Sequence, residues 1–80
     1  EAATLCRTHI QRHGPSTKVY YLLGLIHDAA GEPSEAVADY RKALYLDPSH
    51  RESLLHLAFL LEKQGNKSGA QVLRKRAERI

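Results

Sequence analysis

The sequence of 80 residues lacks most of the features that mark secreted, disulfide-bonded or membrane-spanning proteins. Its single cysteine, Cys6, cannot form an internal disulfide. The longest nearly apolar stretch, Leu54 to Leu61, contains His56 and is far too short to cross a bilayer. No charged leader with an apolar segment and a cleavage site opens the chain. We therefore expect a cytoplasmic protein without membrane insertion.

The patterns that mark enzymes and metal sites are also missing. There is no glycine-rich phosphate loop, no nucleophile triad and no pair of acid–base carboxylates. His9 and His13 have the spacing of a helical metal pair, but Ile10 stands where a zinc-protease motif needs glutamate. No cysteine or carboxylate completes a ligand set at a recognisable spacing. We expect no catalytic residue, metal, cofactor or small-molecule substrate in this chain.

The overall composition, 42% hydrophobic and 26% charged, is that of a soluble globular protein. A chain of 80 residues is one small domain, close to the size at which a single core only just suffices. It begins at Glu1 without a methionine and already in a helical pattern. This start favours a piece of a longer protein, with more chain before Glu1.

Charge is unevenly distributed along the sequence. Residues 1–50 carry five Lys/Arg and six Asp/Glu (5 − 6 = −1), whereas residues 51–80 carry seven and three (7 − 3 = +4). Cations near the end of a helix are favoured by its dipole and keep a terminal helix soluble. No aromatic residues alternate with these cations for base stacking, so we expect no nucleic-acid partner.

A repeat of fixed length organises the chain. Leu23 and Leu57 are separated by one interval (57 − 23 = 34), and the same interval separates three more pairs: Gly31 and Gly65, Ala36 and Ala70, and Ala43 and Ala77. A fixed period of this length is the signature of stacked repeats, and positions separated by it are equivalent. We divide the single domain into a partial repeat at 1–16, a full repeat at 17–50 and a terminal repeat at 51–80.

Apolar residues inside each unit recur at three- and four-residue spacing, which is typical of helices. Gly31, Pro33 and Asp47-Pro48 are expected helix boundaries, because glycine suits a C′ position and proline a first turn. The sequence predicts helices near 1–13, 17–30, 33–46, 52–64 and 67–79, with no sheet. Small residues such as Gly24 and Ala36 are expected where paired helices cross.

These residues resemble a tetratricopeptide repeat. The stretch TKVYYLLGLIHDAAGEPSEAVADYRKALYLDPSH matches that family's pattern at eight positions. They are Tyr20, Leu23, Gly24, Gly31, Ala36, Tyr40, Ala43 and Pro48. The second unit is similar but has Ala58 for the glycine and Arg74 for the second aromatic residue. The resemblance implies an all-α fold of antiparallel helix pairs in a right-handed superhelix of about two and a half repeats. Its first helices would line a concave peptide-binding surface.

A narrower resemblance suggests the setting of these repeats. YYLLGLIHDAAG, KALYLDPSH and ESLLHLAFLLEKQGN are similar to repeats appended to bacterial chemotaxis-receptor glutamate methyltransferases, nearest the Wsp biofilm-formation type. The resemblance implies a C-terminal regulatory or targeting domain in surface sensing. Its S-adenosylmethionine-dependent catalytic domain would lie outside this chain. Partners would be a protein or peptide segment, such as a chemoreceptor tail or the parent enzyme's own catalytic domain.

The last helix is expected to cap the stack. Val37, Tyr40 and Leu44 would pack against a following helix pair, whereas their equivalents in the terminal repeat are Gln71, Arg74 and Glu78. Terminal repeats need a polar outer face for solubility. We therefore expect the native protein to end shortly after Ile80.

A groove is the candidate binding site. After core positions are assigned, apolar residues on the two first helices form two stripes at four-residue spacing, with charged residues beside them. The predicted groove residues are Lys18, Tyr21, Leu22, Leu25, Asp28, Glu52, Leu55, His56, Phe59 and Glu62. The alternative is that these side chains thicken the core between neighbouring helices.

Two other interpretations stay open at this point. The repeats could be a structural module that self-associates. A carboxylate clamp of the chaperone-adaptor type is disfavoured, because it needs Lys and Asn where this sequence has Tyr21 and Leu25.

Overall fold

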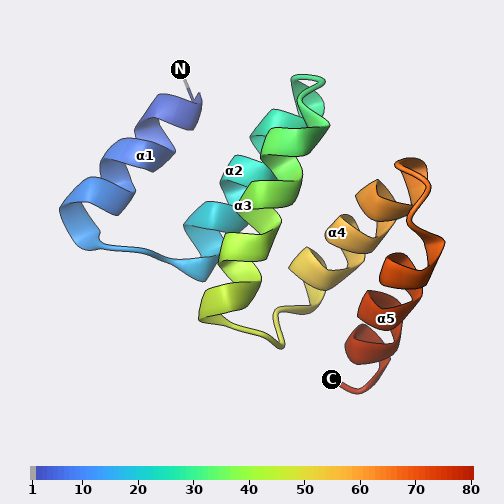
Figure 1. Cartoon of the computed structure of the whole chain (residues 1–80). Coiled ribbons are helices and arrows are strands. Elements are labelled where there is room, and N and C mark those ends of the chain that lie inside the picture. Colours follow the sequence, from blue (N-terminus) through green and yellow to red (C-terminus); the bar gives the residue numbers. More distant parts are fainter. Residues whose placement is uncertain (1) are drawn as a thin grey trace.

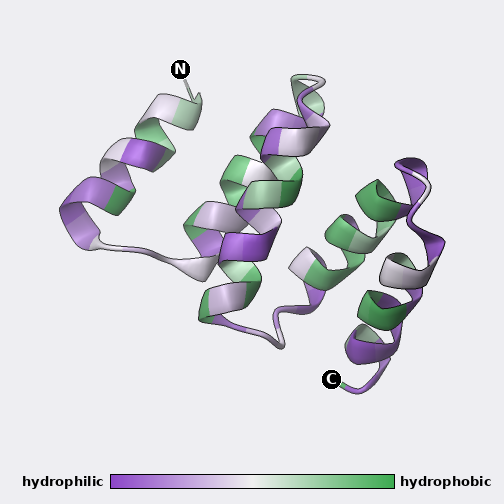
Figure 2. Cartoon of the chain, in the orientation of Figure 1, coloured by the Kyte–Doolittle hydropathy of each residue, from purple (hydrophilic) through white to green (hydrophobic). Residues whose placement is uncertain are grey.

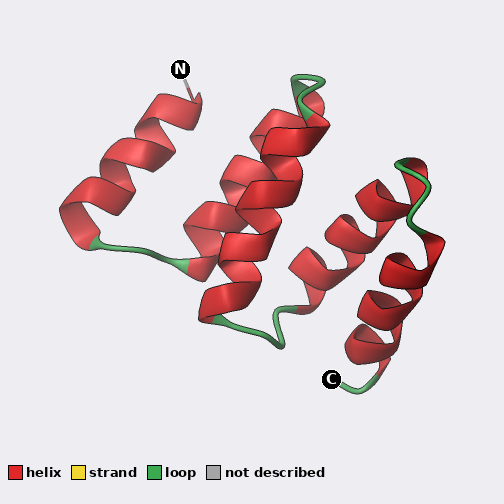
Figure 3. Ribbon diagram, in the orientation of Figure 1, coloured by secondary structure: helices red, strands yellow, loops and turns green. Residues whose placement is uncertain are grey.

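The computed structural model describes residues 2–80, which form five α-helices joined by short loops. The helices are α1 (Ala2–His13), α2 (Thr17–Ala29), α3 (Pro33–Leu46), α4 (Arg51–Lys63) and α5 (Lys67–Glu78). No strand occurs among the described residues (Figure 3). The all-α prediction is confirmed, and the predicted helix ends differ from the observed ones by one residue at most. Glu1, the predicted start of the first helix, lies outside the described residues.

The turns within the two helix pairs share one geometry. Gly31 and Gly65 have φ of 75° and 89°, a left-handed conformation that side chains with a Cβ disfavour. After each glycine, a backbone N–H reaches back to close the preceding helix: Glu32 to the His27 carbonyl at 2.9 Å and Asn66 to the Leu61 carbonyl at 2.8 Å. The predicted role of Gly31 as a helix terminator is therefore confirmed, and Gly65 has the same role at the equivalent position.

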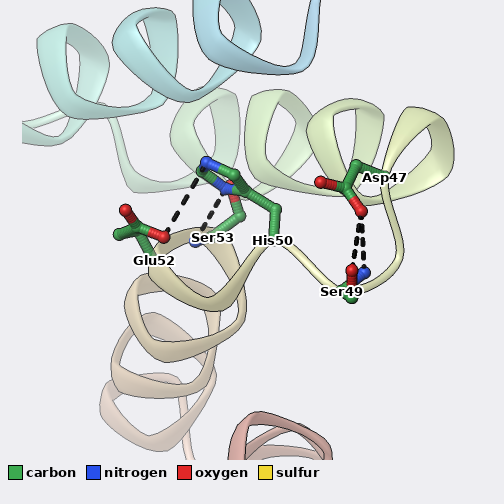
Figure 4. A network of polar contacts seen from close by, with 5 residues as sticks. All are labelled: Asp47, Ser49, His50, Glu52 and Ser53. Atoms are coloured by element: carbon green, nitrogen blue, oxygen red, sulfur yellow. Dashed lines mark hydrogen bonds and ion pairs between the residues drawn. The ribbon is translucent and has the colours of Figure 1, made fainter. Parts of the chain in front are cut away.

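The connection between α3 and α4 is fixed by side chains (Figure 4). Asp47 Oδ1 accepts hydrogen bonds from the Ser49 backbone N–H at 3.1 Å and from its hydroxyl at 2.9 Å. His50 then caps α4, because its Nδ1 accepts the Ser53 backbone N–H at 3.3 Å. Since Nδ1 accepts, the proton of the neutral ring lies on Nε2, which faces the Glu52 carboxylate 3.9 Å away. The end of α3 at Asp47-Pro48 and the start of α4 a few residues later are thus joined by one turn with defined hydrogen bonds.

The helices are arranged as neighbouring antiparallel pairs (Figure 1). Helix α2 packs on α3, and α4 packs on α5, while α3 against α4 joins the two pairs. Helix α1 packs on α2 at the other side of the stack. The described chain measures 36 × 27 × 12 Å along its principal axes. A single row of helix pairs has this flat, extended shape.

The main core spans the second helix pair and its junction with α3. Its members are buried residues of α3, α4 and α5: Ala36, Tyr40, Leu44, Leu54, Leu57, Ala58, Leu60, Leu61, Ala70, Leu73 and Ala77. In contrast, α1 and α5 carry long hydrophilic stretches (Figure 2). The apolar core thus continues from the joint between the repeats into the second pair, and the apolar area that it removes from water stabilises both.

Gly24 is required by the aromatic ring that covers it. A Cβ built at Gly24 would overlap the ring of Tyr40, which is completely buried. The equivalent positions of the terminal repeat hold Ala58 and Arg74, so the ring and the glycine are absent together. The small residue predicted at this crossing therefore makes room for Tyr40 specifically.

We expect Gly24→Ala to lower the free energy of unfolding by about 1–3 kcal/mol, because the added methyl group displaces a ring that has no free space. The control is the same substitution in a Tyr40→Leu background. There the clash is relieved, and alanine should stabilise α2 by up to about 1 kcal/mol because it is the better helix former. Urea denaturation of the four proteins measures both effects. An equal loss in both backgrounds would contradict the role assigned to Tyr40.

Candidate functional site: the face of α2 and α4

The predicted groove residues come from α2 and α4, the first helices of the two pairs. Four of them line one open depression of about 310 Å³: Asp28 of α2, and Leu55, His56 and Phe59 of α4. The two helices are therefore close enough on this face to present side chains to one ligand. These four are the predicted groove residues that the structure brings together around one depression.

Apolar side chains on this face are exposed to solvent. Phe59 is 54% exposed and Leu55 is 42% exposed. The Lys63 ammonium lies 5.4 Å from the centre of the Phe59 ring, which it approaches as a cation–π partner. An apolar strip between the negative Asp28 and the positive Lys63 can hold an apolar side chain and orient polar groups beside it.

Tyr21 belongs in part to the core, contrary to the expectation that it has no core partner. Its ring centre lies 6.0 Å from that of Tyr40, 5.2 Å from that of His50 and 5.5 Å from that of His56. His56 in turn lies 5.7 Å from Tyr40. The alternative that these side chains thicken the core is therefore correct for Tyr21, and half-buried His56 shares the same aromatic cluster.

The Tyr40 hydroxyl, at the centre of this cluster, is buried and has no hydrogen-bond partner among the described residues. Burial raises the pKa of Tyr40 far above its ordinary value, and the negative charge of Asp28 adds to this effect. The hydroxyl is therefore protonated at neutral pH, so a donor is left unpaired in the core.

Glu62, one of the predicted groove residues, is paired with another side chain. Its carboxylate accepts two hydrogen bonds from the guanidinium of Arg74 on α5, at 3.0 and 3.1 Å. These hydrogen bonds, together with the positive charge of Arg74, lower the pKa of Glu62. The ion pair ties the second helix pair together at the position where the first pair has Asp28 and Tyr40.

The remaining predicted residues do not line the depression. Lys18, Leu22 and Glu52 are exposed, and Leu25 is half-buried. Sequence spacing placed all of them on the correct helices. It did not reveal which of them face the neighbouring pair.

A polar cluster that helical spacing did not indicate links α1 to the first helix pair. His27 and Asp39 are both buried, and the Asp39 carboxylate lies 2.5 Å from His27 Nδ1. Arg7 of α1 donates to His27 Nε2 at 3.3 Å. Because arginine can only donate, Nε2 accepts and the single ring proton lies on Nδ1, where Asp39 accepts it. His27 is a buried core residue, and Asp39 supplies the hydrogen-bond partner that a buried polar side chain needs.

A departure from the repeat could have revealed this pair. The equivalents of His27 and Asp39 in the terminal repeat are Leu61 and Leu73, which are buried apolar residues. The two polar residues replace two apolar ones at facing positions. A simultaneous change of this kind indicates direct contact.

The described residues show no arrangement typical of a metal centre or a membrane segment. Within residues 2–80, no group of three or more His, Cys, Asp or Glu side chains is placed to hold a metal ion. The rings of His9 and His13 are tilted by 44° relative to one another, with centres 4.6 Å apart. None of the described helices is long and apolar enough to span a bilayer.

Comparison with known proteins agrees with this architecture. The model of the tetratricopeptide repeat family matches residues 17–50. Residues 17–50 are a tetratricopeptide repeat. The match covers α2, α3 and the turn that follows them. The division of the other residues into a partial repeat and a capped terminal repeat stays a prediction.

The whole chain is similar to part of a group of larger proteins. It is 47% identical over 79 residues to a probable biofilm formation methyltransferase WspC of Pseudomonas putida, and 49% identical to that of Pseudomonas aeruginosa. It is also 33% identical over 73 residues to the protein NPGR2 of Arabidopsis thaliana. The alignments cover 99% of this chain but only 19% of each WspC protein. The predicted resemblance to Wsp-type methyltransferases is confirmed.

We expect Tyr40→Phe to raise the free energy of unfolding by about 1 kcal/mol, because it removes a buried hydroxyl without a partner and keeps the ring. The matched control is Tyr45→Phe, since Tyr45 is 87% exposed and its hydroxyl stays hydrated. Urea denaturation at pH 7 measures both. A loss of stability in Tyr40→Phe would show that the hydroxyl has a partner in solution.

Proposed function

We propose that this chain is a protein- or peptide-binding module that serves as a regulatory or targeting domain of a chemotaxis-type receptor glutamate methyltransferase. The α2–α4 depression binds an apolar anchor of the partner. The observation that carries this proposal is the exposed ring of Phe59 beside Leu55, next to the Asp28 carboxylate of the neighbouring repeat. The similarity to Pseudomonas methyltransferases supports the setting in surface sensing. A cytoplasmic location belongs to the same proposal.

The energetics favour Phe59 as the central contact. Aromatic side chains dominate interface energies, and truncation of one can cost about 2 kcal/mol or more. Burying a half-exposed ring costs little conformational entropy, because the ring has few rotatable bonds. Tyr21 does not line the depression but packs against His56, which does, and its own ring is held by Tyr40 and His50.

We expect Phe59→Ala to weaken binding by roughly 30-fold while the free energy of unfolding changes by about 0.5 kcal/mol or less. Tyr21→Ala should lower stability, because it removes part of the aromatic cluster. The control is Val72→Ala, which truncates a side chain of similar exposure, 59%, on α5. Isothermal titration uses two probes: the isolated methyltransferase domain of the Pseudomonas putida relative, and a synthetic peptide from the C-terminal tail of a chemoreceptor.

Binding of either probe that is lost in Phe59→Ala and kept in Val72→Ala supports the proposal. Absence of binding to both probes, or equal binding by Phe59→Ala, contradicts it. Light scattering at several concentrations distinguishes partner binding from the alternative, in which the chain self-associates. A mass that rises with concentration and falls back in Phe59→Ala would assign the depression to contacts between copies.

A further inference from the structure

A second apolar groove lies between α3 and α5. Its volume is about 400 Å³. The residues that line it are Arg41, Leu44, Tyr45, Pro48, Leu57, Leu73 and Arg76. The leucines are the nearly buried floor, and Tyr45 and the two arginines are the exposed walls.

This groove is separate from the α2–α4 depression. Helix α4 contributes to both, but through different sides: Leu57 to the groove, and Leu55 and Phe59 to the depression. Residues that are two positions apart in an α-helix point about 200° apart around its axis. Leu57 is two positions from both Leu55 and Phe59. A ligand in one site therefore leaves the other free.

Tyr45 is the most exposed large apolar side chain of the groove, at 87%. On its other side it lines a smaller hollow of about 260 Å³, together with Pro15, Tyr20, Lys42 and Leu46. Leu46 is 42% exposed. Tyr45 thus stands between two apolar hollows without being buried by either. An aromatic ring in this position contributes little to folding and offers a large contact area to a partner.

Positive charge surrounds the ring. Arg41 and Arg76 line the groove, and Lys42 lies 5.6 Å from the centre of the Tyr20 ring. The Arg76 guanidinium donates to the Pro48 carbonyl at 2.9 Å, which orients it but leaves its charge uncompensated. Within residues 2–80, none of these three cations forms an ion pair, whereas Arg74 is paired with Glu62. The groove is therefore apolar at its floor and positive at its walls.

We propose that the α3–α5 groove binds an acidic segment of a partner protein. One aliphatic or aromatic side chain of the segment rests on Leu44, Leu57 and Leu73 beside Tyr45. Carboxylates on either side of this anchor accept hydrogen bonds from Arg41 and Arg76, which match a carboxylate with two parallel donors. This site does not depend on the function proposed for the α2–α4 depression.

The test is a titration of the isotopically labelled 80-residue chain, followed by amide resonances. The probe is a synthetic seven-residue peptide with a central phenylalanine and three glutamates on each side. Comparison probes carry lysine for glutamate or alanine for phenylalanine, and a single-stranded oligonucleotide is the fourth probe. We expect the first peptide to shift resonances of Arg41, Tyr45, Leu73 and Arg76 and to leave Leu55 and Phe59 unchanged.

We expect the comparison peptides to bind at least about 10-fold more weakly, and raised salt to weaken the acidic peptide. Tyr45→Ala and Arg41→Glu should each reduce its affinity about 10-fold. Lys67→Glu, the same charge change at an exposed position outside the groove, should have a much smaller effect. Circular dichroism checks that each variant keeps its helices.

Three patterns of binding would overturn the proposal. They are shifts at Leu55 and Phe59 in place of the groove, equal binding of the lysine peptide, or tighter binding of the oligonucleotide with the same shifts. The last result would assign the basic groove to nucleic acid. Absence of any shift with the acidic peptide at millimolar concentration would also overturn it.

Discussion

The buried ring of Tyr40 is the contact on which the rest of the structure depends. It comes from α3, lies over Gly24 of α2, and packs with Tyr21 of α2 and His56 of α4. Three helices from two repeats therefore meet at one side chain. Because the ring is rigid and fully buried, small movements between the repeats would open a void around it. Tyr40 fixes how α2 and α4 lie relative to one another, and so fixes the face on which the α2–α4 depression lies.

Comparison of equivalent positions in the two repeats shows how each helix pair is adapted to its neighbours. The first pair has Gly24, Asp28 and Tyr40, and the second has Ala58, Glu62 and Arg74 at the same places. In the first, a buried aromatic residue joins two repeats. In the second, Arg74 turns back to Glu62 and closes its own pair with two hydrogen bonds. This change is what a capping helix needs, and the capping role of α5 stays a proposal.

The fold could be predicted from the sequence because its determinants are local. Gly31, Gly65 and Pro48 end helices through backbone geometry, and the fixed period of the repeat sets how the pairs stack. The candidate site could be predicted only in part. Helical spacing identified Leu55, Phe59 and Asp28, but it did not distinguish Tyr21, which is held by Tyr40, or Glu62, which is held by Arg74. The His27–Asp39 contact joins facing helices, so only the comparison with Leu61 and Leu73 carries a signal for it.

Native-state hydrogen exchange of the backbone amides of Leu23, Tyr40 and Leu57 tests the role of Tyr40 most directly. These residues lie in α2, α3 and α4, on the two sides of the joint between repeats. If Tyr40 joins the two pairs into one cooperative unit, the three amides should exchange with the same free energy of opening, equal to that of global unfolding. A free energy for Leu57 clearly below that of Leu23 and Tyr40 would show that the second pair opens alone. The Tyr40 contact would then not fix the α2–α4 face.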